Sequence, residues 1–99
     1  MMNTIRQGDL LFIRISPAVI PPGAVVRPDG IIARGEATGH THRLVQGVLL
    51  AVAARLYVRA AQACEVIHEE HHPVALPAGD WEVRRQIEYN PDGWRQVAD

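Results

Sequence analysis

The sequence predicts an all-β fold, either a small barrel or a two-sheet sandwich of five to seven short strands. Short apolar runs rich in β-branched residues alternate with turns that contain glycine or proline, which is the pattern of small antiparallel β-domains. The C-terminal third also alternates strictly between apolar and polar side chains. With 99 residues the chain has the size of a single domain, so one β-rich domain over 1–99 is expected.

The first half of the chain contains three predicted strands. QGDLLFIRIS places an apolar run after a Gly-Asp turn signal and predicts a strand over about 9–15. The prolines of PAVIPPGAVVRPDG predict a loop with a brief edge strand at 24–27, because proline cannot donate a backbone hydrogen bond. GIIARGE, at 30–36, predicts a further strand that ends in the turn EATG.

The middle segment, 48–63, fits two structures. Its alanines, and polar residues spaced by three or four positions, fit an amphipathic helix. The alternation of RLYVR and the absence of a helix N-cap signal favour strands. We favour strands, and a helix over about 48–63 stays open as the alternative.

Alternation is clearest in the strand expected for 81–89. Arg85 shares a face there with Trp81, Val83, Ile87 and Tyr89. If that face lines the interior, the guanidinium needs an anionic partner or ligand, which makes Arg85 a candidate site residue. The alternative is that the face is half exposed at the mouth of a barrel and that Arg85 extends into water.

A hairpin is expected at the C-terminal end of the sequence. NPDG, at 90–93, supplies a four-residue turn, after which WRQVAD can return antiparallel. This register places Tyr89 opposite Trp94 and Glu88 opposite Arg95.

Composition excludes several classes of function. The net charge of -1 and the pI near 6.5 give no general attraction for duplex DNA. The single cysteine, Cys64, excludes an internal disulfide framework and a multi-cysteine zinc site, and it suits a reducing, cytoplasmic setting. Apolar runs are too short for a signal peptide or a membrane helix. We expect a cytoplasmic protein without a membrane partner, and an oligomer stays open.

The histidines give the clearest indication of function in this sequence. His40 and His42 form an H-x-H pair in GHTH, and on a strand both imidazoles project from the same face toward one metal ion or substrate group. A second group, HEEHH, begins at His68 and has the H-E-x-x-H pattern of zinc metalloproteases, with Glu69 as general base. Pro73 argues against the helix that this pattern needs, because the residue before a proline disfavours the α conformation.

An extended backbone suits the second group better. Alternation along a strand would place His68, Glu70 and His72 on one face, where they could complete a site with the H-x-H pair. Two or three histidines with one carboxylate form a ligand set for Zn, Fe, Mn or Ni. The alternative is a solvated hydrophilic loop.

The GHTH segment in a small Gly- and Pro-punctuated chain resembles a reduced cupin barrel. The resemblance implies a metal held by an H-x-H pair, a carboxylate and a further histidine, although here no Glu follows the pair within RLVQGV. The wider pattern TGHTHR, HEEHHP and LPAGDWEVRRQIEY is similar to small bacterial and phage-borne proteins of about this length, which carry no assigned activity.

Three functions follow as hypotheses. The first is a small hydrolase-like enzyme with a histidine-lined pocket that holds a divalent metal through the candidate ligands His40, His42, His68 and His72. In this enzyme Glu70 or Glu69 would move protons.

The second hypothesis is a metal-independent phosphodiesterase or ribonuclease that acts on RNA or a small molecule. Two of these histidines would be the acid and base, and Arg85, Arg43 or Arg84 would clamp the phosphate. The third is a non-catalytic interaction or regulatory module that binds through exposed Trp81, Tyr89 and Trp94.

Overall fold

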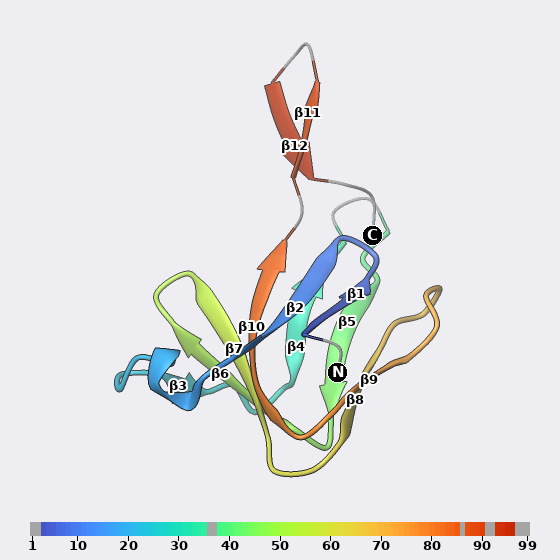
Figure 1. Cartoon of the computed structure of the whole chain (residues 1–99). Helices are drawn as coiled ribbons and strands as arrows, with labels where there is room; N and C mark the ends of the chain where they lie inside the picture. Colours follow the sequence, from blue (N-terminus) through green and yellow to red (C-terminus); the bar gives the residue numbers. More distant parts are fainter. Residues whose placement is uncertain (1–2, 36–37, 86, 91–92, 97–99) are drawn as a thin grey trace.

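A computed structural model describes residues 3–35, 38–85, 87–90 and 93–96, with side chains described up to residue 85. The described residues form twelve β-strands and one short 3-10 turn, η1 (Pro17–Val19), and they contain no α-helix (Figure 1). The strands are β1 (Thr4–Gln7), β2 (Leu10–Ile15), β3 (Val25–Val26), β4 (Ile31–Arg34), β5 (Thr41–Val45), β6 (Val48–Val52), β7 (Arg55–Ala60), β8 (Cys64–Ile67), β9 (Val74–Leu76), β10 (Gly79–Arg85), β11 (Ile87–Asn90) and β12 (Gly93–Gln96). No helix in this part of the chain is long and apolar enough to cross a membrane.

The strands form two antiparallel sheets that pack as a sandwich. One sheet has six strands in the order β1-β2-β10-β7-β6-β3, and the other has four in the order β4-β5-β8-β9. The β11 and β12 strands pair only with each other and extend beyond the end of β10 (Figure 1). The two-sheet prediction is therefore confirmed. The closed barrel is wrong because neither sheet closes on itself, and the expected five to seven strands were too few.

Most of the expected strands are present. The 9–15 strand is β2, the brief edge strand is β3 at the margin of the larger sheet, and the 30–36 strand is β4. The helical alternative for 48–63 is wrong, because β6 and β7 pair directly there as a hairpin. The chain makes this turn with Ala53, which adopts a left-handed φ of 51°.

The strand expected over 81–89 is divided between two sheets. β10 pairs with β2 and β7, whereas β11 pairs with β12. The predicted hairpin register is confirmed, with Tyr89 opposite Trp94 and Glu88 opposite Arg95. The turn residues 91–92 lie outside the described residues.

Both sheets contribute side chains to one apolar core. Phe12, Val58 and Trp81 come from the larger sheet, and Val66 and Leu76 from the smaller, and all five have 0% exposure. Burial of a large apolar side chain stabilises the fold by about 1.5–3 kcal/mol. The expected exposure of Trp81 is wrong, because that ring is enclosed and its Nε1 donates a hydrogen bond of 3.1 Å to the Pro77 carbonyl.

The first hairpin brings polar groups to one end of this core. Gln7 of β1 pairs with Leu10 of β2, so Gly8 and Asp9 form a two-residue turn. Gly8 has a φ of 59° and Asp9 has no positive φ, as in a type II′ turn, where glycine is preferred at the first position. β2 also pairs with β10. In this register Leu10 is opposite Arg85, so Arg85 lies beside Asp9 although the two residues are far apart in the sequence.

Candidate functional site

Four of the five imidazoles meet at this end of the sandwich. His42 lies in β5 and His40 just before it, whereas His68 and His71 lie in the loop after β8. The ring centroids are 5.5 Å apart for His40 and His68, 4.4 Å for His42 and His68, and 4.6 Å for His68 and His71. Pairing of β5 with β8 explains the contact, since it places the two histidine segments on adjacent strands. We call these four residues the histidine cluster.

The HEEHH segment is a turn, so the predicted strand is wrong there. β8 ends at Ile67, and Nδ1 of His68 then accepts hydrogen bonds from the backbone N–H of Glu70 at 3.0 Å and of His71 at 3.2 Å. These bonds turn the backbone and break the alternation of faces. As a result, His71 lies in the histidine cluster, while His72 is exposed and has no described ring contact with the cluster.

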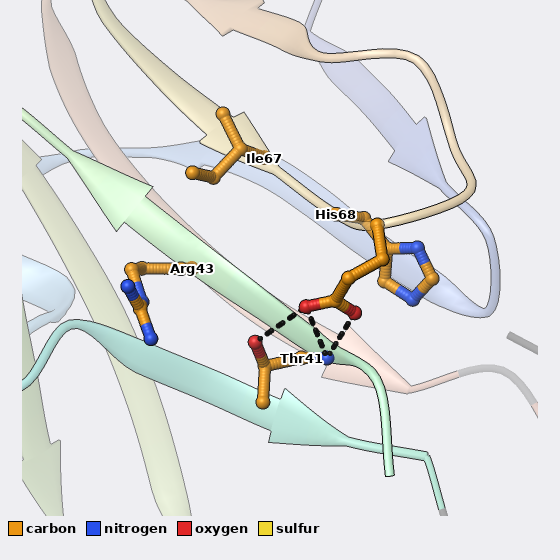
Figure 2. A pocket seen from close by; sticks show the side chains of 5 residues that line it. Thr41, Arg43, Ile67 and His68 are labelled. Carbon is orange, nitrogen blue, oxygen red and sulfur yellow. Dashed lines mark hydrogen bonds between the residues drawn. The ribbon is translucent and has the colours of Figure 1, made fainter. Parts of the chain in front are cut away.

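The outer part of the cluster offers a set of metal ligands. His40, His68 and Glu69 each present one ligand atom, and the three atoms lie within 4.8 Å of one another. The Glu69 carboxylate accepts hydrogen bonds from the Thr41 backbone N–H at 2.9 Å and from the Thr41 hydroxyl at 3.2 Å (Figure 2). The backbone hydrogen bond is the main cause of a lowered pKa at Glu69, which keeps this group ionised. We call His40, His68 and Glu69 the outer group.

Glu70 contacts His40, one member of the outer group. Its carboxylate lies 3.2 Å from Nδ1 of His40. A histidine that donates Nδ1–H to a carboxylate presents Nε2 as the basic or metal-binding nitrogen. Glu70 therefore orients His40 and determines which of its nitrogens is presented.

The inner part of the cluster is enclosed by protein. His42 has 0% exposure, and its Nδ1 lies 2.8 Å from Oε1 of Gln7. The Gln7 amide nitrogen donates hydrogen bonds of 2.9 Å to the carbonyls of Val66 and His72, so its oxygen must be an acceptor. His42 therefore carries its proton on Nδ1 and directs Nε2 toward Asp9, whose Oδ1 is 3.6 Å away.

Asp9 is a buried carboxylate with one partner on each side. Its exposure is 2%, and Oδ2 forms an ion pair of 3.0 Å with Nε of Arg85. This contact supplies the anionic partner that an inward guanidinium requires and lowers the cost of burying both charges. No hydrogen bond from the described residues reaches Oδ1, which faces His42.

Five of the six predicted site residues therefore converge, and one does not. His40, His42 and His68 belong to the histidine cluster, and Glu70 and Arg85 contact its outer and inner parts. His72 contributes only its backbone carbonyl, through Gln7. Sequence reasoning overlooked Gln7, Asp9 and His71 as site residues, and it gave Glu69 no role as a metal ligand.

The outer group opens into a pocket. A cavity of about 210 Å³ lies beside it and is lined by Thr41, Arg43, Ile67, His68 and Glu69 (Figure 2). The guanidinium of Arg43 and the carboxylate of Glu69 thus border the same space.

The fold and the site define a class of protein: a small β-sandwich domain with a histidine-rich polar site at one end of its core. The chain belongs to the family described as Domain of unknown function (DUF8820), whose model matches residues 6–86. That range contains every residue of the histidine cluster, together with Gln7, Asp9 and Arg85. No curated protein and no solved structure matches the chain significantly.

Proposed function

We propose that this domain is a hydrolase that uses a divalent metal ion bound by the outer group, His40, His68 and Glu69. The proposal is carried by the convergence of three ligand atoms within 4.8 Å of one another, two of them from residues that line a pocket. Two imidazoles and one carboxylate, with further positions open to water and substrate, are a common ligand set of catalytic zinc and of related metals.

Two further contacts support a metal ion at this position. Glu70 holds His40 by Nδ1, which is how outer carboxylates orient metal-binding histidines. Asp9 directs a buried oxygen without a described hydrogen bond toward His42, and the ring of His42 packs against that of His68. Arg85 balances the charge of this carboxylate, so its oxygen contributes as an acceptor behind the metal ligands rather than as a net negative charge.

The residues divide the chemistry among them. A divalent ion would lower the pKa of a bound water to about 7 and supply hydroxide at neutral pH. Glu70 would keep His40 oriented, and Thr41 would hold Glu69 ionised and in place. Gln7 would fix the tautomer of His42, which supports the His68 ring from the interior.

One observation favours a second candidate, a metal-independent acid–base hydrolase. Because Nδ1 of His68 accepts two backbone hydrogen bonds, the proton of its neutral ring lies on Nε2 in this conformation, and metal binding by His68 would require the turn to give up these two bonds. His40, oriented by Glu70, presents an unprotonated Nε2 in its neutral form. In the metal-free enzyme His40 would be the general base, and the Nε2–H of His68 would be a neighbouring hydrogen-bond donor.

The test is elemental analysis of protein purified without an affinity tag, before and after loading with Zn²⁺ or Mn²⁺ and desalting. We expect about one ion per chain in the wild type and in His72→Ala, whose ring is exposed and outside the cluster. We expect a loss of about 100-fold or more in affinity for His40→Ala and Glu69→Gln, which each remove one ligand.

Hydrolysis of p-nitrophenyl acetate and bis(p-nitrophenyl) phosphate, measured with the loaded protein and in EDTA, separates the two candidates. Metal-dependent turnover that His40→Ala abolishes supports the first candidate. Turnover that survives EDTA but not His68→Ala supports the second. No ion retained after loading, or equal retention in His40→Ala, refutes the metal proposal.

A further inference from the structure

We infer that the pocket beside the outer group binds a phosphate group through Arg43, so that the substrates of the proposed hydrolase are phosphate esters. This inference rests on the proposed function for the reaction, but phosphate binding itself can be measured separately. The juxtaposition that carries it is a guanidinium and two of the metal-ligand residues, His68 and Glu69, on the walls of one cavity.

The sheet register sets the position of Arg43. It lies two residues after Thr41 on β5, so both side chains are on the same face of the strand. Its cross-strand partners are Ile67 on β8 and Ile31 on β4. Arg43 and the Thr41–Glu69 contact therefore stand at two positions along one pocket, as Figure 2 shows.

The guanidinium of Arg43 forms no ion pair with the described part of the protein. Arg59, Arg84 and Arg85 each form an ion pair with a carboxylate, but no described carboxylate pairs with Arg43. Guanidinium binds phosphate through two parallel N–H···O bonds and remains charged at every physiological pH. Arg43 is thus able to bind an anion without giving up an existing partner.

The metal ion and the phosphate should bind cooperatively. Without an ion, the charge on Glu69 opposes that on Arg43, and the pocket attracts anions weakly. A divalent ion on the outer group reverses this balance, so the pocket becomes cationic. By linkage, the ion that strengthens phosphate binding must itself be bound more tightly when phosphate is present.

The size of the pocket limits the ligand. A cavity of about 210 Å³ holds the volume of about seven waters, which suits a phosphate group and a short part of its ester substituent. Hydrolysis there would form a bond from the water oxygen to phosphorus and break the ester P–O bond. The proton lost by the water is taken up by the departing oxygen.

The experiment is a calorimetric titration of inorganic phosphate into zinc-loaded, desalted protein and into zinc-free protein. We expect measurable binding by the loaded wild type and binding weaker by about 10-fold or more without zinc. Arg43→Met should lose about 10-fold or more, and Arg43→Lys should recover part of the loss, because lysine keeps the charge but not the paired hydrogen bonds. Arg55→Met, at an exposed position on the other sheet, is the matched control.

The results separate this inference from the proposed function. If zinc binds but phosphate binds equally to wild type and Arg43→Met, or to neither, the inference is wrong and the metal site stands. If zinc does not bind, the proposed function is wrong, and the zinc-free titration decides the inference: binding that depends on Arg43 supports it, and no such binding refutes it. In the activity assay, Arg43→Met should impair bis(p-nitrophenyl) phosphate hydrolysis and spare p-nitrophenyl acetate.

Discussion

Replacement of Gly8 by alanine should loosen the inner part of the histidine cluster and destabilise the protein. Gly8 has a φ of 59°, and a Cβ there would lie 2.8 Å from Nε2 of His71 and 3.3 Å from Cε1 of His42. Gly39 has a similar φ of 72°, but a Cβ there would meet no described atom within 4 Å. Both Gly8→Ala and Gly39→Ala therefore strain the backbone, but only Gly8→Ala also introduces a steric clash.

The expected magnitudes follow from these two terms. A left-handed backbone conformation destabilises the folded state by about 1–2 kcal/mol when alanine replaces glycine. The lower conformational entropy of the unfolded chain offsets about 0.4–1 kcal/mol of this loss. Gly39→Ala should therefore lower the free energy of unfolding by about 1 kcal/mol. Overpacking adds about 1–3 kcal/mol at Gly8, so Gly8→Ala should cost about 2–4 kcal/mol.

Urea unfolding, followed by tryptophan fluorescence, measures both variants. With a denaturant slope of about 1–2 kcal/mol/M, the midpoints of the two variants should differ by about 0.5–3 M. In a His71→Ala background the excess cost of Gly8→Ala should shrink, because the nearest clashing atom is gone. Equal midpoints for Gly8→Ala and Gly39→Ala, or an excess cost unchanged by His71→Ala, would refute the packing argument.

Three further predictions concern the rest of the fold. Gln7 is 3% exposed and makes three hydrogen bonds, so Gln7→Met should lower the free energy of unfolding by about 2–5 kcal/mol in the same urea assay. The control is Gln62→Met at an exposed position, which should change the free energy of unfolding by less than about 0.5 kcal/mol. Ala53→Gly relieves a left-handed φ and should raise the free energy of unfolding by about 0.5–1 kcal/mol, which is measured as a higher thermal midpoint. Ala54→Gly should lower the thermal midpoint. If both variants have a lower midpoint, the proposed strain at Ala53 is wrong. Cys64 is 2% exposed and burial raises its pKa, so native protein should resist a thiol reagent that labels it once unfolded. Because burial raises the native pKa of the thiol, its contribution to stability is full below the unfolded pKa and is lost as pH rises from there through the raised native pKa. Stability at alkaline pH should therefore fall less in Cys64→Ala than in the wild type, and equal slopes would be the contrary result.

Local pattern predicted the strands well but could not predict how the sheets are divided. The alternation around Trp81 gave the strand and its buried face correctly, since one buried face imposes a period of two. It did not indicate that pairing changes from β2 and β7 to β12 near residue 86, because pairing partners are chosen by distant segments.

The candidate site was predicted in part for the same reason. Of the H-x-H pair, His42 lies on a strand as expected and His40 lies directly before it, and Arg85 has the anionic partner that its inward position required. Asp9 was interpreted only as a turn residue, because a Gly-Asp pair before a strand carries no signal of burial. His71 was assigned to the wrong face, since two backbone hydrogen bonds to the His68 ring replace the strand with a turn.

The pairing of β2 with β10 also determines when the site can form during synthesis. This register joins Leu10 to Arg85, so the contact between Arg85 and Asp9 awaits translation of nearly the whole matched domain. Contacts of such sequence separation carry a large loop-closure cost and form slowly. Until β10 has joined the sheet, Asp9 in the turn of the first hairpin lacks its ion pair with Arg85. The ion pair that buries Asp9 can therefore form only after β10 has left the ribosome, whereas the pairing of β5 with β8, which assembles the metal ligands, needs no residue of β10.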